Sequence, residues 1–224
     1  VTKPIAVTRA GWATGPNTLM ADANEVFDTT FFGKAFESPV GSDSPDSNQM
    51  FEYSALMIMA STDATTVQVD ADRDGTFEST YTINEGESAF VNGGVKKGGR
   101  IVSDKPVQVE LITGDISSNY ESRFFRLLPT STWTDALTTP VATAATVDGS
   151  TSGTRVWLYN PNAASITVRK IARNSSNSSS LTTNLITLAA NANSSQTLTE
   201  GCAARFESTN GAHFYALSTT DSTS

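Results

Sequence analysis

The chain has 224 residues, of which 15 are basic and 23 acidic, so its formal net charge is −8. This balance argues against binding to nucleic acids or anionic membranes, because both need a basic surface. Only 17 % of the residues are charged, against about 25 % in typical soluble domains. Ser, Thr, Asn and Ala fill the difference, and the first three suit strands and turns better than helices. No apolar run reaches 18 residues, so we expect no membrane-spanning segment.

The N-terminal segment Lys3 to Thr8, KPIAVT, is predicted as a strand. Its proline stands near the start, where a missing N–H is tolerated. Residues 17–50 are predicted to be irregular, with a short helical turn over Leu19 to Val26 and with phenylalanines that pack onto a core. The first part of the chain is therefore predicted to contain one strand followed by a long connection.

The apolar run from Phe51 to Ala60 predicts a buried strand, with a ten-residue buried helix as the alternative. Thr66 to Asp70 alternates between apolar and polar residues, Asp74-Gly75 is a hairpin turn signal, and Phe77 to Ile83 returns. Further strands are predicted over 88–91, 105–112, 156–159, 166–171, 181–188, 196–198, 203–207 and 212–217. Short strands separated by turns every 8 to 12 residues are typical of a sandwich or barrel.

Segments of the chain recur at a nearly constant spacing. KPV at position 105 follows KPI at position 3 by 102 residues, and PV at 140 follows PV at 39 by 101. The apolar strands at 55 and 155 lie 100 residues apart. Such spacing indicates an internal duplication. We therefore predict an all-β fold of duplicated β-sandwich units, jelly-roll or immunoglobulin-like, with short strands and long irregular connections.

The predicted organisation has four parts. Residues 1–50 hold the N-terminal strand and an irregular segment that packs on the core. Residues 51–115 form the first β unit, 116–152 a connecting segment, and 153–224 the second β unit.

Several stretches resemble one known family. MASTDATTVQVD, INEGE and IVSDKPVQVELITGD, together with FFGKAFESPV before the first apolar strand, are similar to the N-terminal domain of IgG-Fc-binding proteins and its microbial relatives. The resemblance covers residues 27–141 and extends faintly into the second copy. It implies the fold and a secreted or cell-surface location. The cysteines common in animal members are absent, so Fc binding is not implied.

The candidate metal ligands are carboxylates around the predicted hairpin turn: Asp70, Asp72, Asp74 and Glu78. Carboxylates at alternating positions before a glycine turn can converge on calcium, which takes six to eight oxygen ligands. The pattern is not an EF-hand, because the twelfth position is Tyr81 rather than glutamate. The alternative is a solvated acidic hairpin tip that holds no cofactor.

The sequence shows no catalytic constellation, and we expect no enzyme. The single histidine, His213, lacks the partners of a zinc site, and no G-x-S-x-G motif accompanies it. A hydrolase with His213 or an acidic pair in a cleft is the third and least favoured function class. The single cysteine, Cys202, is predicted to be a small buried residue, with pairing between chains as the alternative.

Three asparagines begin N-x-S sequons and are candidate glycosylation sites in exposed loops: Asn174, Asn177 and Asn193. Trp12, Trp133 and Trp157 are candidates for a carbohydrate platform, but Trp133 and Trp157 stand beside or within strand-like segments. We expect these tryptophans to pack in the core rather than to form a carbohydrate platform.

The N-terminal strand matches the last strand of the first unit, yet no preceding unit is present for it to join. The candidate assembly residues are Lys3, Pro4, Ile5, Ala6 and Val7. This strand pairs within the chain, or it adds to a sheet of a neighbouring copy and produces an open filament. We therefore expect an extracellular structural protein, a subunit of a filament, pilus-like or surface-layer assembly whose partners are its own copies. The alternative is a cell-surface adhesin or carbohydrate-binding module that binds glycans, with or without calcium.

Overall fold

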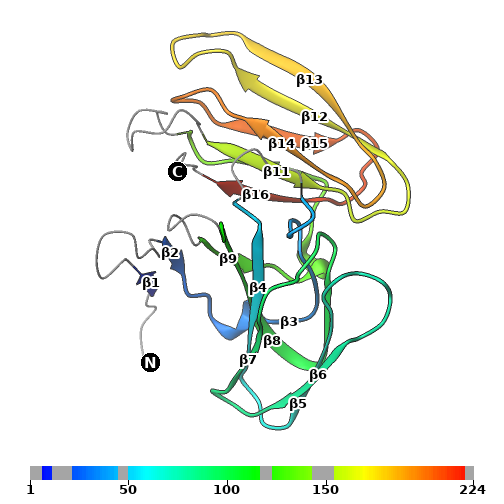
Figure 1. Cartoon of the computed structure of the whole chain (residues 1–224). Helices are drawn as coiled ribbons and strands as arrows, with labels where there is room; N and C mark the ends of the chain where they lie inside the picture. The colour runs from blue at the N-terminus through cyan, green and yellow to red at the C-terminus, as the bar shows by residue number, and fades with distance from the viewer. Residues whose placement is uncertain (1–6, 12–21, 45–49, 117–122, 143–153, 220–224) are drawn as a thin grey trace. The chain divides into compact units, whose positions relative to one another are not determined.

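The computed structural model describes residues 7–11, 22–44, 50–116, 123–142 and 154–219 (Figure 1). In these ranges the chain consists of antiparallel strands and two short 3-10 turns, which confirms the predicted all-β class. None of the described segments is a helix long and apolar enough to cross a membrane. The chain divides into two compact units, Val1–Thr132 and Trp133–Ser224.

The strands of the first unit are β1 (Thr8–Gly11), β2 (Asp22–Glu25), β3 (Gly33–Glu37), β4 (Tyr53–Ala60), β5 (Thr65–Asp70), β6 (Ser79–Ile83), β7 (Ser88–Val91), β8 (Arg100–Gly114) and β9 (Arg123–Leu127). Its two 3-10 turns are η1 (Thr29–Phe31) and η2 (Thr130–Thr132). The strands of the second unit are β10 (Ala136–Thr138), β11 (Arg155–Tyr159), β12 (Ile166–Arg173), β13 (Leu181–Leu188), β14 (Asn193–Thr197), β15 (Ala204–Ser208) and β16 (Tyr215–Thr219).

The 15-residue strand β8 organises the first unit, because it changes partners part-way along its length. Its first half pairs with β3 and β5, and its second half pairs with β4 and β9. Pairing with β5 ends at Ser103 and pairing with β4 begins at Val107. Pro106 lies between the two ladders, where its missing N–H costs no inter-strand bond. The strand order is β6-β5-β8-β4-β7, and a tight turn joins β6 to β7, so this sheet curls back and nearly closes.

Alternating apolar residues of these strands fill the core of the first unit. Side chains without exposed surface include Phe51, Leu56, Ile58, Val67, Val69, Ile101, Val109 and Leu111. Each such side chain stabilises the fold by about 1.5–3 kcal/mol relative to an exposed position. The predicted strand at 51–60 is therefore confirmed, and the helical alternative is wrong.

The second unit is a sandwich of two sheets. One sheet has the order β10-β15-β12-β13 and the other the order β14-β11-β16. Buried side chains from both sheets form one apolar cluster that includes Leu158 of β11, Val168 of β12 and Phe206 of β15. The ring of Trp133 lies edge-on to that of Tyr159, with 6.0 Å between the ring centroids.

The two units share a pattern of strand pairing. β4 pairs with β7 and β8, and β11 pairs with β14 and β16. β5 pairs with β6 and β8, and β12 pairs with β13 and β15. The single strand β8 of the first unit thus has the place of both β15 and β16 in the second. Duplication of the sequence remains a prediction.

The segments predicted as irregular connections contain strands. β2 and β3 lie within residues 17–50, and β9 and β10 lie within residues 116–152. β2 lies where a short helical turn is predicted, so that prediction is wrong over residues 22–25. The other three strands complete sheets outside these segments. β3 and β10 pair with strands far away in the sequence, β8 and β15, whereas β9 pairs with the strand before it, β8. The boundary between the units, after Thr132, also falls inside the predicted connection.

Candidate metal centre

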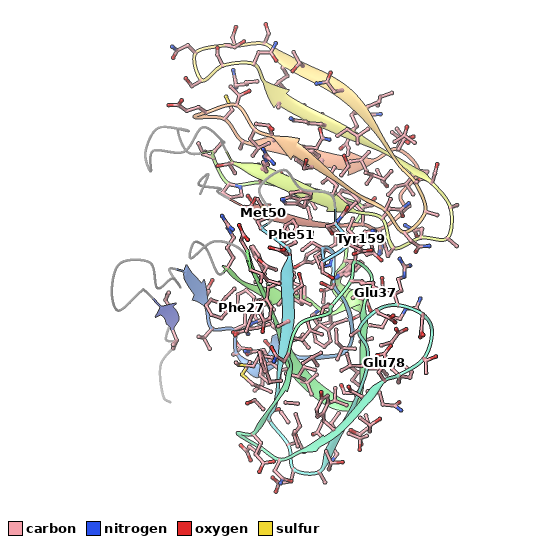
Figure 2. All side chains as sticks on the ribbon, in the orientation of Figure 1. Phe27, Glu37, Met50, Phe51, Glu78 and Tyr159 are labelled. Atoms are coloured by element: carbon pink, nitrogen blue, oxygen red, sulfur yellow. The ribbon has the colours of Figure 1, made fainter. Side chains whose placement is uncertain are left out.

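The connection between β5 and β6 brings together the four carboxylates that the sequence singles out: Asp70, Asp72, Asp74 and Glu78. One ligand atom from each lies within 4.8 Å of the other three. Oxygens on opposite sides of a calcium ion, each about 2.4 Å away, are about 4.8 Å apart. The cluster therefore has the span of one calcium coordination sphere. Figure 2 shows Glu78 at this connection.

The connection is shaped by its own side chains. Gly75 has φ +94°, which confirms the special conformation expected of an Asp-Gly turn. The carboxylate of Asp74 accepts a hydrogen bond from Thr76 N at 2.7 Å, and that of Glu78 accepts one from Ala71 N at 2.9 Å. These bonds orient the carboxylates before any cation arrives.

Asp70 differs from the other three carboxylates because only 2 % of its surface is exposed. Its Oδ2 accepts a hydrogen bond from Gly75 N at 3.1 Å. Its Oδ1 is buried and has no hydrogen-bond partner. A buried carboxylate oxygen without a partner is unfavourable, because it has lost water and gained nothing in return. A cation bound by the cluster would supply the missing interaction.

Asp72 bonds to groups inside and outside the connection. A hydrogen bond from Lys96 Nζ to its Oδ2, 3.3 Å long, is the main reason that the pKa of Asp72 lies below its usual value. A bond from the backbone N–H of Asp74 to its Oδ1 acts in the same direction. The carboxylate is therefore ionised at neutral pH and suited to a cation.

The loop between β7 and β8 supports the cluster from outside. Lys96 N donates to the carbonyl oxygen of Ala71 at 2.9 Å. A Cβ on Gly99 would lie 2.6 Å from the same oxygen, so the close approach requires glycine there. Sequence reasoning missed Lys96 and Gly99 as parts of this site. The KKGG stretch gives their composition but not their proximity to a loop about 25 residues earlier.

The basic residues of this loop and of β8 have acidic or carbonyl partners. Lys97 pairs with Asp43 at 2.9 Å, and Arg100 pairs with Glu37 at 3.6 Å. Lys105 donates to the carbonyl oxygens of the turn before β5. The basic residues of this stretch therefore make ion pairs and hydrogen bonds within the first unit.

The remaining candidate residues do not converge on another site. His213 is exposed, and Cys202 is buried as a free thiol. The two tryptophans Trp133 and Trp157 are buried, as predicted. Over the ranges with assigned structure, the acidic cluster is the one group of three or more metal-ligating side chains.

The sequons differ in their settings. Asn174 and Asn177 are exposed between β12 and β13, whereas Asn193 lies half-buried in β14. Glycosylation at these positions stays a prediction.

Of the candidate assembly residues, Lys3 to Ala6 lie outside the described part of the chain. Val7 is described, and its carbonyl accepts a hydrogen bond from Val26 N at 2.8 Å. The strand that follows, β1, pairs with β2 of the same chain. Pairing within the chain therefore begins at Val7, and addition to a neighbouring copy stays a prediction for Lys3 to Ala6.

Comparison with protein family models, with curated proteins and with solved structures finds no match for this chain. The resemblance to the N-terminal domain of IgG-Fc-binding proteins therefore stays a prediction, and the arguments below use the residues of this chain alone.

Proposed function

We propose that the protein is an extracellular structural protein whose first unit binds calcium at the β5–β6 connection. The observation that carries the proposal is the buried Oδ1 of Asp70, which lacks a partner and belongs to a cluster of four carboxylates. The turn uses only one oxygen of this carboxylate, because Oδ2 accepts from Gly75 N. A bound cation would give the other oxygen, Oδ1, the partner that it lacks.

The four side chains have different roles in this proposal. Asp70 connects the ion to the end of β5. Asp72, Asp74 and Glu78 each hold a backbone N–H of the connection and offer carboxylate oxygens to the ion. Water molecules complete the six to eight oxygens that calcium takes. Magnesium fits less well, because it demands octahedral geometry at about 2.0–2.1 Å and keeps most of its water.

The structural role follows from what the ion would join. It would tie the end of β5 to the start of β6 and, through Ala71, to the loop before β8. The extracellular setting is supported by the low charged fraction of the chain and by its many Ser, Thr and Asn residues. Extracellular calcium modules bind with dissociation constants of about 10⁻⁴–10⁻³ M, which suits a largely solvent-exposed loop.

Assembly of copies of the chain into a filament or surface layer completes the proposed function. The sequence supports it through the predicted strand addition.

Isothermal titration with calcium chloride tests the proposal. The native chain should bind one ion with a dissociation constant of about 10⁻⁴–10⁻³ M. Asp70→Asn should reduce the affinity at least tenfold. The matched control is Asp63→Asn, because Asp63 accepts a backbone hydrogen bond in another turn of the same unit and lies outside the cluster. Absence of binding to the native chain, or equal affinity in Asp70→Asn, would overturn the proposal.

A further inference from the structure

The edge strand β13 has features that a monomeric protein usually avoids. It is eight residues long, reads LTTNLITL, and contains neither a charged residue nor a proline. One of its edges pairs with β12 along its whole length. At its other edge no described strand pairs, and Figure 1 shows β13 as the outermost strand of its sheet. Natural proteins protect such edges with lysines, prolines or bulges, since a bare edge pairs with other chains.

The outward face of β13 is also apolar at two positions. Leu181 and Leu185 are 63 % and 67 % exposed. Thr183 and Thr187 are exposed on the same face, whereas Ile186 and Leu188 on the opposite face pack against the core of the second unit. The exposed leucines therefore contribute little to the described fold.

We propose that β13 pairs antiparallel with β13 of a second copy of this chain, so that one sheet continues across a two-fold axis. Directly opposite residues in antiparallel strands lie on the same face. With Thr183 on the axis, Leu181 of each copy lies opposite Leu185 of the other. This register places Leu181 and Leu185 of both copies in two cross-strand pairs. A register centred on Leu185 would pair only the two Leu185 side chains.

A second copy fits this edge better than a charged partner does. The strand itself is uncharged. Two arginines of β12 lie opposite its leucines, but Arg169 is paired with Glu207 and Arg173 donates to the carbonyl oxygen of Ser178. Its two leucines are four residues apart on one face, which makes the edge complementary to itself in the antiparallel direction. Such an isologous contact closes as a dimer. A filament would need a further contact, and the predicted N-terminal strand addition supplies one.

The contact should respond little to salt. Residues 133–224 carry five basic and five acidic side chains, so the second unit is neutral and the acidic excess of the chain lies in residues 1–132. Salt screens exposed charges beyond a distance of about 10 Å at 0.1 M. We therefore expect dimerisation to change little with ionic strength, unlike that of an interface built on ion pairs.

Sedimentation velocity over a concentration series tests the contact in calcium-free buffer. The native chain should show a concentration-dependent dimer. Thr183→Lys should be monomeric, because it places two like charges opposite each other on the axis. The matched control is Thr80→Lys, an exposed threonine in the edge strand β6 of the first unit, and it should dimerise like the native chain. Circular dichroism of both variants checks that they fold. A monomeric native chain, or dimerisation of Thr183→Lys, would overturn the proposal.

Cysteine cross-linking tests the register. Opposed Cα atoms in an antiparallel pair are about 4.5 or 5.5 Å apart, within the range of a disulfide. Thr183→Cys should therefore form a covalent dimer under mild oxidation, and the native Cys202 does not interfere because it is buried. In Leu185→Cys the two cysteines are four residues out of register, about 13 Å apart, and should not cross-link. If Leu185→Cys forms the covalent dimer and Thr183→Cys does not, the proposed register is wrong. If neither variant cross-links, the pairing of the two β13 strands is wrong.

This inference rests on the assembly part of the proposed function, but the two can fail separately. If Thr183→Lys still assembles while deletion of residues 1–10 abolishes assembly, the edge contact is wrong and the proposed assembly stands. If the native chain does not self-associate under any condition, both are wrong.

Discussion

The hairpins β5–β6 and β12–β13 occupy corresponding places in the strand pairing of the two units but differ in their chemistry. The first has an acidic connection in which carboxylates bind backbone N–H groups and one aspartate is buried. The second has a connection of asparagine and serine, and its outer strand carries exposed leucines.

The comparison shows which parts of the unit are needed for the fold. Both hairpins keep the same neighbours in their sheets, although no carboxylate cluster is present in the second. The acidic residues are therefore not required to make this hairpin. Their presence in the first unit alone fits a function of that unit, namely the proposed calcium binding. Self-pairing of β13 would likewise be a function of the second unit alone.

The largest difference we predict concerns two cross-strand ion pairs, one in each unit. In the first unit Glu110 lies opposite Arg126, with 3.1 Å between the carboxylate and the guanidinium, and both side chains are almost fully buried. In the second unit Arg169 lies opposite Glu207, with 2.7 Å between the charged groups, and much of this pair is exposed. Glu110→Gln should lower the free energy of unfolding by about 3–5 kcal/mol, because it removes one charge of a buried ion pair.

Glu207→Gln is the control for that prediction and should cost less than about 1 kcal/mol, as is typical of exposed pairs. Urea denaturation of both variants measures the difference. Equal losses would mean that burial does not set the strength of these pairs.

A smaller effect is expected where the β7–β8 loop supports the acidic connection. Gly99→Ala places a Cβ about 2.6 Å from the Ala71 carbonyl oxygen. Overpacking of this kind costs about 1–3 kcal/mol. Displacement of Ala71 should also weaken calcium binding by about tenfold, or about 1.4 kcal/mol.

Gly86→Ala serves as the matched variant for Gly99→Ala. Gly86 has φ +80°, so alanine is strained there, but its added Cβ would meet no atom within 4 Å. It should lower the thermal midpoint while the calcium affinity measured by titration stays unchanged. A similar loss of affinity in both variants would show that general destabilisation, not the contact with Ala71, controls binding.

The smallest effect we predict is a response to acid that is confined to the first unit. Burial alone would raise the pKa of Asp43, but hydrogen bonds from Lys97 N and Nζ and the lysine charge outweigh it and hold the pKa below its ordinary value of 3.8. A lowered pKa in the folded state gives stability that is present above pH 3.8 and is lost as the pH falls through the folded pKa.

The loss at low pH should be smaller in Asp43→Asn, which has no carboxylate to protonate. Urea midpoints at pH 6 and pH 3 for the native chain and for this variant measure the effect. An identical pH dependence would contradict the assigned pairing of Asp43 with Lys97.

The sequence predicts the regular strands well because local patterns determine them. The alternating residues of β5 and the apolar run of β4 are visible in the sequence, and both strands are present. β2 has the sequence DANE, composed of residues that rarely favour strands, and it exists through its pairing with β1. The strand predicted over 105–112 is shorter than β8, because the first residues of β8 are strand through their pairing with β3 and β5, which lie far away in the sequence.

The candidate site shows the same division. The spacing of the three aspartates and Glu78 is a local signal, and it identified all four carboxylates. The burial of Asp70 and the support from Lys96 and Gly99 depend on how distant loops pack, which no local pattern encodes.

The central claim is that Asp70 is buried in order to bind a cation, and thermal unfolding of the native chain and Asp70→Asn tests it most directly. In the presence of a chelator, the variant should be at least as stable as the native chain, because a neutral amide replaces a buried carboxylate whose Oδ1 has no partner. In millimolar calcium the order should reverse, since ligand binding to the folded state stabilises only the native chain. If the variant is less stable by the same amount in both buffers, Asp70 is a structural residue of the turn and the calcium site is wrong.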